Sequence, residues 1–333
     1  MVLAALRSSL VGRGEMLQNS IHGAGKHRFK VIPNWFQSGG LRIGNGHGVA
    51  MTSCGYLAFL NDGPDAQLIL IDPQSGKVQL AKPLGLAKAH GLSLVREAGR
   101  DVLFATCLDS HRAIKMTLFG DVLAEYPFPM SALKPDGYGN VSEYHPSWTV
   151  HHPDGRFVIL DGYGRDFFLE YSAAGSFSKM YGGNAGGVPH WGPHAGHHDV
   201  YQANGKQFHV AMSDQRSIVT WSWDGRILGS VPLDGSDPRM LRPIDGGWVV
   251  AHIGGKWPQD FKAPGSVTFH DKRLKPVGAV GASLTNVDGK TTLVTRDDTP
   301  FRHPHDAVLT NAGDLYVAQY DSGDQPLVKL ERV

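Results

Sequence analysis

Residues 197–231 read HHDVYQANGKQFHVAMSDQRSIVTWSWDGRILGSV, and their pattern decides the fold because it recurs along the chain. The stretch consists of a histidine, a short apolar run, a glycine-containing turn, two further apolar runs and an Asp-Gly turn into a fourth. Short apolar runs bounded by glycine, asparagine and aspartate are typical of β-strands joined by tight turns. The stretch therefore predicts a sheet of four short strands.

The pattern occurs six times, and each copy opens with a residue in the same slot: His47, His90, His145, His197, Arg239 and His305. Repeated units of four short strands are typical of a β-propeller. The last copy has three strands, and residues 26–36 (KHRFKVIPNWF) are predicted to supply its fourth, which leaves no open sheet edge. The sequence thus predicts an all-β, six-bladed propeller over residues 28–333, closed by an N-terminal strand and preceded by an extension of residues 1–27. A β-sandwich or a pair of β domains fits the regular recurrence less well.

The composition excludes several classes of partner. The chain has 333 residues, 32 Lys and Arg against 31 Asp and Glu, and a formal net charge of +1, with its charges scattered. It lacks the basic patch expected of a nucleic-acid or anionic-membrane surface, and no apolar run is long enough to span a bilayer. The start of the chain has no secretion signal, and Cys54 and Cys107 do not make a disulfide framework. We expect a cytoplasmic protein that acts on a small molecule; its oligomeric state stays open.

Imidazoles in the repeated slot predict a metal site. The first strand of every propeller blade lines the central channel, so residues in the same slot form a ring around the axis. The second, fourth and sixth copies lie about a third of a turn apart, and their slots hold His90, His197 and His305. Three neutral imidazoles bind zinc or another divalent transition ion and leave one position open for a substrate. The alternative is that the channel histidines only hydrogen-bond to water.

Four motifs carry a family resemblance: AHGLSLV at residues 89–95, LDGYGRD at 160–166, GHHDVY at 196–201 and HPHDAV at 303–308. On these motifs the chain resembles the NHL-type six-bladed propellers, and among them the peptidyl-α-hydroxyglycine α-amidating lyases. The resemblance implies that zinc is bound by His90, His197 and His305. It also implies that Tyr163 acts in catalysis and that Asp306 lies beside a structural calcium ion.

The resemblance spans residues 45–333, and the sequence departs from the family at several positions. The arginine that the family carries at the end of the second strand of the first blade is absent, because this chain has Asn61 and Asp62 there. His47 and His145 add imidazoles, and the family's disulfides have no matching cysteines. The sequence therefore supports the family's fold and its bound metal ion better than it supports the family's substrate. Amidation of secreted peptides is disfavoured by the missing export signal.

An open three-histidine metal site beside a tyrosine suits lyase chemistry. The ion makes a substrate hydroxyl easier to deprotonate, a base takes the proton, and loss of a leaving group from the same carbon gives a carbonyl. Tyr163 is the predicted base, with Arg165 lowering its pKa, and His145 is a further candidate catalytic group. The predicted function is a metal-dependent lyase acting on a small α-hydroxy or hemiaminal-like compound. The alternative for Tyr163 is a turn residue whose hydroxyl faces solvent.

The predicted substrate contacts are two ring residues and two loop residues: His47, Arg239, Trp191 and His194. The loop residues lie in residues 182–196, one of three long inserts, with 131–144 and 285–304, that are predicted to be loops over one face. Two other functions remain. One is a lactonase-like hydrolase around a calcium ion held by carboxylates, which the imidazole-rich ring disfavours. The other is a non-catalytic NHL propeller that binds a protein or RNA, which the near-neutral charge disfavours.

Overall fold

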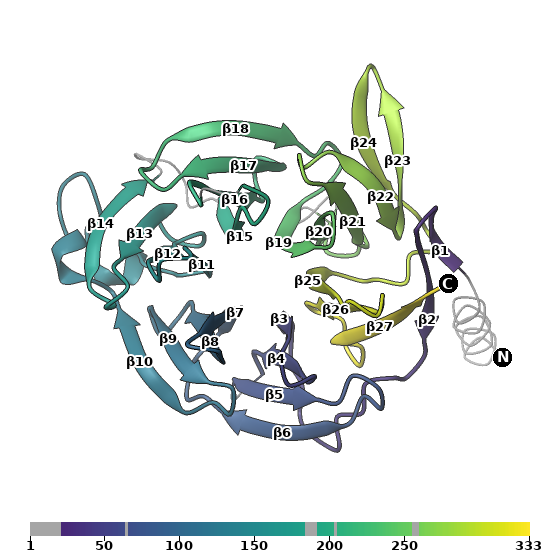
Figure 1. Cartoon of the computed structure of the whole chain (residues 1–333), viewed down its shortest axis with the longest axis horizontal. Coiled ribbons are helices and arrows are strands. Elements are labelled where there is room, and N and C mark those ends of the chain that lie inside the picture. Colours follow the sequence, from purple (N-terminus) through teal and green to yellow (C-terminus); the bar gives the residue numbers. More distant parts are fainter. Residues whose placement is uncertain (1–20, 64–65, 184–191, 203–204, 255–259) are drawn as a thin grey trace.

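Six sheets surround a central axis in the computed structural model, which describes residues 21–63, 66–183, 192–202, 205–254 and 260–333 (Figure 1). Within each sheet, consecutive strands pair in antiparallel order from the axis to the rim. The all-β, six-bladed propeller predicted from the repeat is confirmed. Among the described residues, no helix has the length and apolar character needed to cross a membrane.

The first three blades take up residues 46–182. Blade 1 consists of β3 (Gly46–Met51), β4 (Leu57–Asn61), β5 (Gln67–Ile71) and β6 (Val78–Pro83). Blade 2 consists of β7 (Ala89–Glu97), β8 (Arg100–Cys107), β9 (Arg112–Thr117) and β10 (Val122–Pro127). Blade 3 consists of β11 (Trp148–His151), β12 (Phe157–Leu160), β13 (Phe167–Tyr171) and β14 (Phe177–Gly182).

The other three blades complete the ring. Blade 4 consists of β15 (Pro193–His198), β16 (Gln207–Met212), β17 (Ser217–Ser222) and β18 (Ile227–Pro232). Blade 5 consists of β19 (Pro238–Ile244), β20 (Gly247–His252), β21 (Ser266–Asp271) and β22 (Pro276–Val280). Blade 6 consists of β25 (Pro304–Leu309), β26 (Leu315–Gln319) and β27 (Leu327–Arg332), to which β2 (His27–Ile32) adds the outer strand.

The N-terminal strand closes the ring as predicted. β2 pairs antiparallel with β27, and Val31 lies opposite Leu330. A short strand that was not predicted, β1 (Ile21–Ala24), pairs with β2 and lies within the range assigned to the N-terminal extension. Residues 1–20 of that extension lie outside the described residues. Because both ends of the propeller sequence meet in one sheet, closure ties blade 6 to the start of the chain.

Apolar side chains fill the spaces between neighbouring blades. One cluster joins Leu60 and Leu68 of blade 1 to Leu92 and Leu103 of blade 2, and equivalent clusters join the blades that follow. Since both faces of an inner strand pack against a neighbour, β4 and β12 are buried along their whole length and are apolar except for Asn61 at the end of β4. The outer strands face solvent instead.

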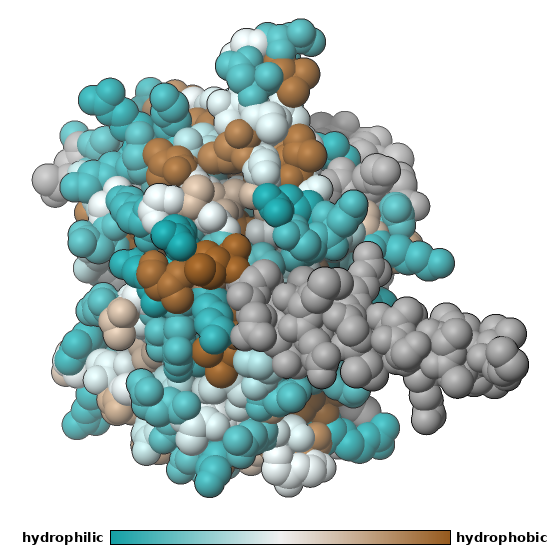
Figure 2. Space-filling model, turned by 90° about the vertical axis from the view of Figure 1, so that its right-hand side faces the viewer, coloured by the Kyte–Doolittle hydropathy of each residue, from teal (hydrophilic) through white to brown (hydrophobic). Residues whose placement is uncertain are grey.

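Two of the inserts predicted as loops contain regular structure. Residues 285–304 include most of a hairpin of β23 (Ala282–Val287) and β24 (Lys290–Thr295), which projects from the ring between blades 5 and 6 (Figures 1 and 2). The insert at 131–144 carries two 3-10 turns, η1 (Met130–Ala132) and η2 (Val141–Glu143). In the insert at 182–196, residues 184–191 lie outside the described residues, and β15 begins at Pro193.

Candidate metal centre

The first strands of five of the six blades have an irregular register where they begin. In β3, β15, β19 and β25 the pairing with the second strand skips one residue, and in β7 it skips two. The skipped residues form a β-bulge in each strand. The skipped residue, or in β7 the first of the two, is His47, His90, His194, Arg239 or His305. In blade 3 the equivalent place is taken by Ser147, just before β11. Its carbonyl oxygen accepts a hydrogen bond from Nδ1 of His90, the histidine of the preceding blade. A bulge redirects the side chain it carries.

This register corrects two predicted slots. His197 lies three residues beyond His194, about 10 Å further along the strand, and its ring contacts His198 and Trp248 rather than the ring of histidines. His145 precedes Ser147, and its Nδ1 atom lies 3.1 Å from the carbonyl oxygen of Leu108, away from the other slot residues. The structure therefore places neither His197 nor His145 in the ring.

A sequence signal for the correct register was present but missed. Four of the slot residues directly follow a proline, in Pro146-Ser147, Pro193-His194, Pro238-Arg239 and Pro304-His305. Proline lacks an N–H group, so it is suited to the point where a strand begins its ladder. Aligning the copies on this proline, rather than on the histidine nearest the strand, places His194 and Ser147 in the slots.

Four imidazoles meet in the channel. The ring of His90 lies 4.8 Å from each of His47, His194 and His305, measured between centroids. His305 lies 4.5 Å from His47 and 4.9 Å from His194. Ring nitrogens of His47, His90 and His305 all lie within 4.8 Å of one another, and all four side chains are buried. Alternate blades thus bring three histidines together as expected, with His194 in place of His197, and His47 is a fourth.

Backbone carbonyls fix how three of these rings are protonated. The Nδ1 atoms of His90, His194 and His305 lie 2.9, 2.8 and 2.8 Å from the carbonyl oxygens of Ser147, Arg239 and His47. A carbonyl only accepts, so each Nδ1 carries the proton and each Nε2 keeps a lone pair. Burial, together with neighbouring histidines and Arg239, holds the pKa of each of these imidazoles well below its usual range. They are neutral, as metal ligands must be.

His47 has the opposite orientation. Its Nε2 atom lies 2.7 Å from Oδ2 of Asp62. Burial favours the protonated form of Asp62, but His47 and hydrogen bonds from Asn45 outweigh it and lower the pKa of that carboxyl. The carboxylate therefore accepts from Nε2 of His47, and Nδ1 faces His305. Asp62 was recognised in the sequence only as a residue standing where the family has arginine.

The spacing of one nitrogen pair fits a divalent transition ion. Nδ1 of His47 lies 3.3 Å from Nε2 of His305. Two nitrogens bound to one tetrahedral ion at about 2.0–2.1 Å are about 3.3 Å apart. An ion bound at this place would be coordinated by both nitrogens, and imidazole suits zinc, iron, copper, cobalt and nickel.

Tyr163 completes the cluster from the turn between β12 and β13. Its hydroxyl lies 3.2 Å from Nε2 of His90, 3.0 Å from Nε2 of His194 and 3.5 Å from Nη1 of Arg239. The buried side chain of Asp161 holds this turn by accepting from the backbone N–H group of Arg165. Burial raises the pKa of Tyr163 to about 12 although Arg239 acts in the opposite direction. Tyr163 thus points into the channel, and not to solvent.

The cation beside Tyr163 is Arg239 and not Arg165. Nη1 of Arg165 pairs with Glu143 at 3.4 Å, at the outer end of the turn. Arg239 is 1 % exposed and lies 3.3 Å from the carboxylate of Asp237, so a guanidinium is held inside the channel. Trp191, a predicted substrate contact, lies outside the described residues.

Asp306 is not available to a metal ion, which corrects the calcium prediction. Its carboxylate accepts from Nε and Nη2 of Arg242, at 2.9 and 2.7 Å, and from the backbone N–H groups of Val49 and Ala307, both at 2.8 Å. Asp306 is completely buried, and these donors use both of its oxygens. Arg242 therefore supplies the positive charge for which the resemblance implied calcium.

Fold and site together define a six-bladed propeller with a cluster of buried histidines on its axis. No protein-family model and no curated protein matches the sequence. Among solved structures, the chain is similar to a gluconolactonase from Xanthomonas campestris, with 11 % identity, 95 % of each chain covered and a TM-score of 0.60. It is also similar to virginiamycin B lyase from Staphylococcus aureus, with 14 % identity, 87 % of this chain and 84 % of that chain covered and a TM-score of 0.52.

A third similar structure is a luciferin-regenerating enzyme, with 12 % identity, 88 % of this chain and 92 % of that chain covered and a TM-score of 0.56. At these identities the likeness shows the fold alone. The three neighbours are propeller enzymes named for different substrates. The resemblance to amidating lyases stays a prediction.

Proposed function

We propose that the protein is a metal-dependent lyase that acts on a small α-hydroxy or hemiaminal-like compound. The observation that carries the proposal is the group of His47, His90 and His305, whose ring nitrogens all lie within 4.8 Å of one another. These residues, with Nε2 of the neighbouring His194 as a fourth nitrogen, would hold a divalent transition ion. An ion that accepts five or six ligands then keeps a position for substrate with all four imidazoles bound.

When bound, the ion would polarise a substrate oxygen and lower the pKa of its hydroxyl. Tyr163 would take that proton at its hydroxyl oxygen once the bound ion and the guanidinium of Arg239, at 3.5 Å, lower its pKa from about 12 and favour the phenolate. The electrons of the O–H bond form the carbonyl, while the C–N or C–O bond breaks and its electron pair leaves with the nitrogen or oxygen. Tyr163 then returns the proton to the leaving group. Arg239 is also placed to bind an anionic group of the substrate.

Metal analysis of the purified protein tests the centre. We expect close to one transition ion per chain, lost in His90→Ala, His194→Ala and His305→Ala. His197→Ala is the matched control, because this histidine lies on the same strand as His194 but outside the cluster; it should keep the ion. A protein that binds calcium alone, or no metal, contradicts the proposal.

Activity is tested by offering α-hydroxy-amides and hemiaminals and measuring release of the carbonyl product. Tyr163→Phe should reduce release by about 10²- to 10⁴-fold and keep the ion. The second candidate is a lactonase-like hydrolase, favoured by the likeness to a gluconolactonase along 95 % of both chains. Hydrolysis of lactones without carbonyl release from the first substrates would decide for it. We also propose a cytoplasmic location, which the free thiols of Cys54 and Cys107 support.

A further inference from the structure

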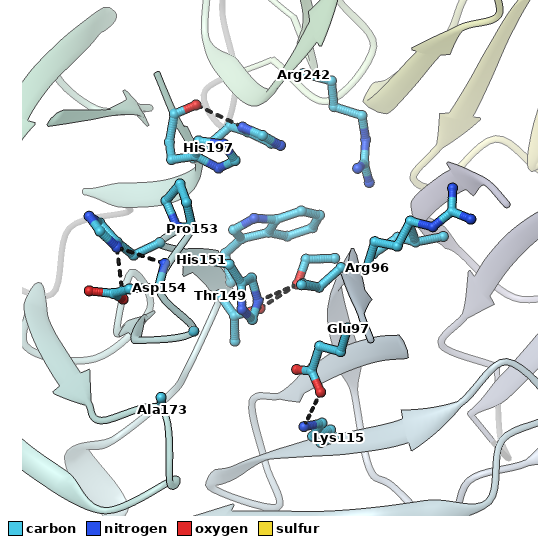
Figure 3. Close-up of a pocket in the computed structure, with 18 of the residues that line it drawn as sticks. Arg96, Glu97, Lys115, Thr149, His151, Pro153, Asp154, Ala173, His197 and Arg242 are labelled. Atoms are coloured by element: carbon cyan, nitrogen blue, oxygen red, sulfur yellow. Dashed lines mark hydrogen bonds and ion pairs between the residues drawn. The ribbon is translucent and has the colours of Figure 1, made fainter. Parts of the chain in front are cut away.

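A second pocket opens at the other end of the channel-lining strands. The histidine cluster uses the N-terminal ends of these strands, whereas the C-terminal ends of β7, β11 and β15 surround a cavity of about 540 Å³ (Figure 3). A cavity of this size accommodates a small molecule. Polar side chains that are buried or nearly so converge on it from four blades: Ser93, Thr149, His151, His197 and Arg242.

Arg242 provides a cationic donor to this pocket. Its Nε and Nη2 atoms are used by Asp306, and Nη2 also donates to the carbonyl oxygen of Leu92 at 2.9 Å. Nη1 makes no hydrogen bond to the part of the chain that the structure describes, and the guanidinium lies 5.4 Å from the ring of Trp148. Figure 3 shows this side chain extending into the pocket. A guanidinium that still has N–H groups free to donate, in a largely buried site, is suited to bind a carboxylate.

The charges of the lining favour an anion. Its two carboxylates already have cationic partners, because Glu97 lies 2.6 Å from Nζ of Lys115 and Asp154 lies 2.9 Å from Nε of Arg156. Arg96, also in the lining, donates to a backbone carbonyl and not to an acid. A ligand therefore meets guanidinium donors and no uncommitted carboxylate.

His197 adds a hydrogen-bond acceptor to the pocket, and a simple anion has no donor group to match it. Its Nδ1 atom lies 2.8 Å from the carbonyl oxygen of His198, so Nδ1 carries the proton and Nε2 offers a lone pair. Burial lowers the pKa of this imidazole to about 3, which keeps it neutral. The lone pair repels the oxygens of phosphate but accepts from an alcohol O–H group. The hydroxyls of Ser93 and Thr149, which lie 3.2 and 2.9 Å from Nε2 of His151, extend the same hydrogen-bonding surface.

We propose that this pocket binds a small hydroxy-carboxylate, with the carboxylate on Arg242, a hydroxyl donating to Nε2 of His197 and the carbon chain against Trp148. The site is separate from the metal centre, and neither depends on the other. It explains why a histidine that the sequence pattern singled out is buried among polar groups outside the ring.

Calorimetric titration of the full chain with glycerate, propionate and inorganic phosphate tests the proposal. We expect glycerate to bind at least tenfold more tightly than propionate, which lacks the hydroxyl, and than phosphate. His197→Leu should reduce glycerate affinity to that of propionate. The double variant Arg242→Met/Asp306→Asn, which removes the cation and its buried partner charge together, should bind none of the three, with folding checked by thermal unfolding.

Arg226→Gln is the matched control, because Arg226 is an exposed arginine of blade 4 that pairs with Asp224; its glycerate affinity should equal that of the wild type. The proposal is overturned if glycerate binds no more tightly than propionate, if phosphate binds most tightly, or if a folded double variant still binds glycerate.

Discussion

The imidazoles of His47 and His305 lie next to each other where the last blade of the propeller meets the first. Nδ1 of His305 donates to the carbonyl oxygen of His47, and Nδ1 of His47 lies 3.3 Å from Nε2 of His305. The two residues are 258 positions apart, and β25 of blade 6 packs directly beside β3 of blade 1. The candidate metal centre therefore spans the seam between the last blade and the first.

Metal removal should lower the stability of the fold. An ion that binds the folded state alone adds about 2.7 kcal/mol when its concentration is 100 times its dissociation constant. We expect a chelator to reduce the Tm in a calorimetric scan and excess zinc or cobalt to restore it. His194→Ala should show a low Tm that the chelator no longer changes. An equal chelator shift in that variant would contradict a metal site at His194.

Asp62→Ala should weaken metal binding by about 10- to 100-fold, since a carboxylate behind a ligating histidine orients the ring and raises its basicity. Competition with a fluorescent chelator measures the affinity. Asp154→Ala is the control, because Asp154 makes the same 2.7 Å contact with a histidine, His152, outside the channel. Equal metal affinity in the two variants would remove His47 from the ligand set.

Tyr163→Phe should reduce turnover by about 10²- to 10⁴-fold, the usual contribution of a general acid–base group. The metal content should not change, because the proposed ligands of the ion are imidazole nitrogens and do not include the phenol. Arg239→Gln should also lose activity, whereas Arg165→Gln should retain it, because Arg165 pairs with Glu143 and not with Tyr163. Steady-state kinetics of the three variants distinguish these roles, and a larger loss in Arg165→Gln would contradict them.

Asp306→Leu should destabilise the protein by about 3–5 kcal/mol, because it leaves the charge of Arg242 buried without a partner. Urea unfolding measures the change. The double variant Arg242→Met/Asp306→Leu should recover part of the loss, since it removes both charges. Calcium should not stabilise the wild-type protein, because Arg242 already supplies the positive charge beside Asp306. A rise in the urea unfolding midpoint on addition of calcium would contradict this assignment.

Acid should destabilise the fold through histidines outside the centre. In blade 5, Thr268 lies between Nε2 of His252 and Nε2 of His270, at 2.6 and 2.8 Å. Burial lowers the pKa of His252 to about 3 and that of His270 to about 4, against 6.5 for a free histidine. The unfolded chain binds more protons as pH falls from 6.5 towards 3, so stability is full above pH 6.5 and declines through that window. His252→Phe should flatten the decline measured by urea unfolding at several pH values; an unchanged slope would contradict this assignment.

The propeller architecture could be predicted because all blades share one pattern of apolar runs and turns. Closure of the ring by an N-terminal strand could be predicted because the last copy of the pattern has only three strands. The slot register could not be read from periodicity alone. A bulge at the start of β15 shifts the ladder, and a shift of three residues exchanges His194 for His197. The prolines before the slots carried that information, but only when all copies are compared.

The role of Asp306 was beyond sequence reasoning for a different reason. A carboxylate next to a predicted ligand suggested a cation, and the pattern could not show that the cation comes from Arg242, 64 positions earlier. Arg239 and Asp62 were likewise visible as residues but not as neighbours of Tyr163 and His47. Contacts across a channel depend on which blades face each other, and local spacing does not record them.

Arg242 starts in blade 5, reaches Asp306 of blade 6 and Leu92 of blade 2, and lies against Trp148 of blade 3. Through these contacts one guanidinium connects four blades beside the cavity of Figure 3. A substitution of Arg242 therefore removes a link from all four blades at once, so the relative positions of these blades around the channel depend on a single side chain.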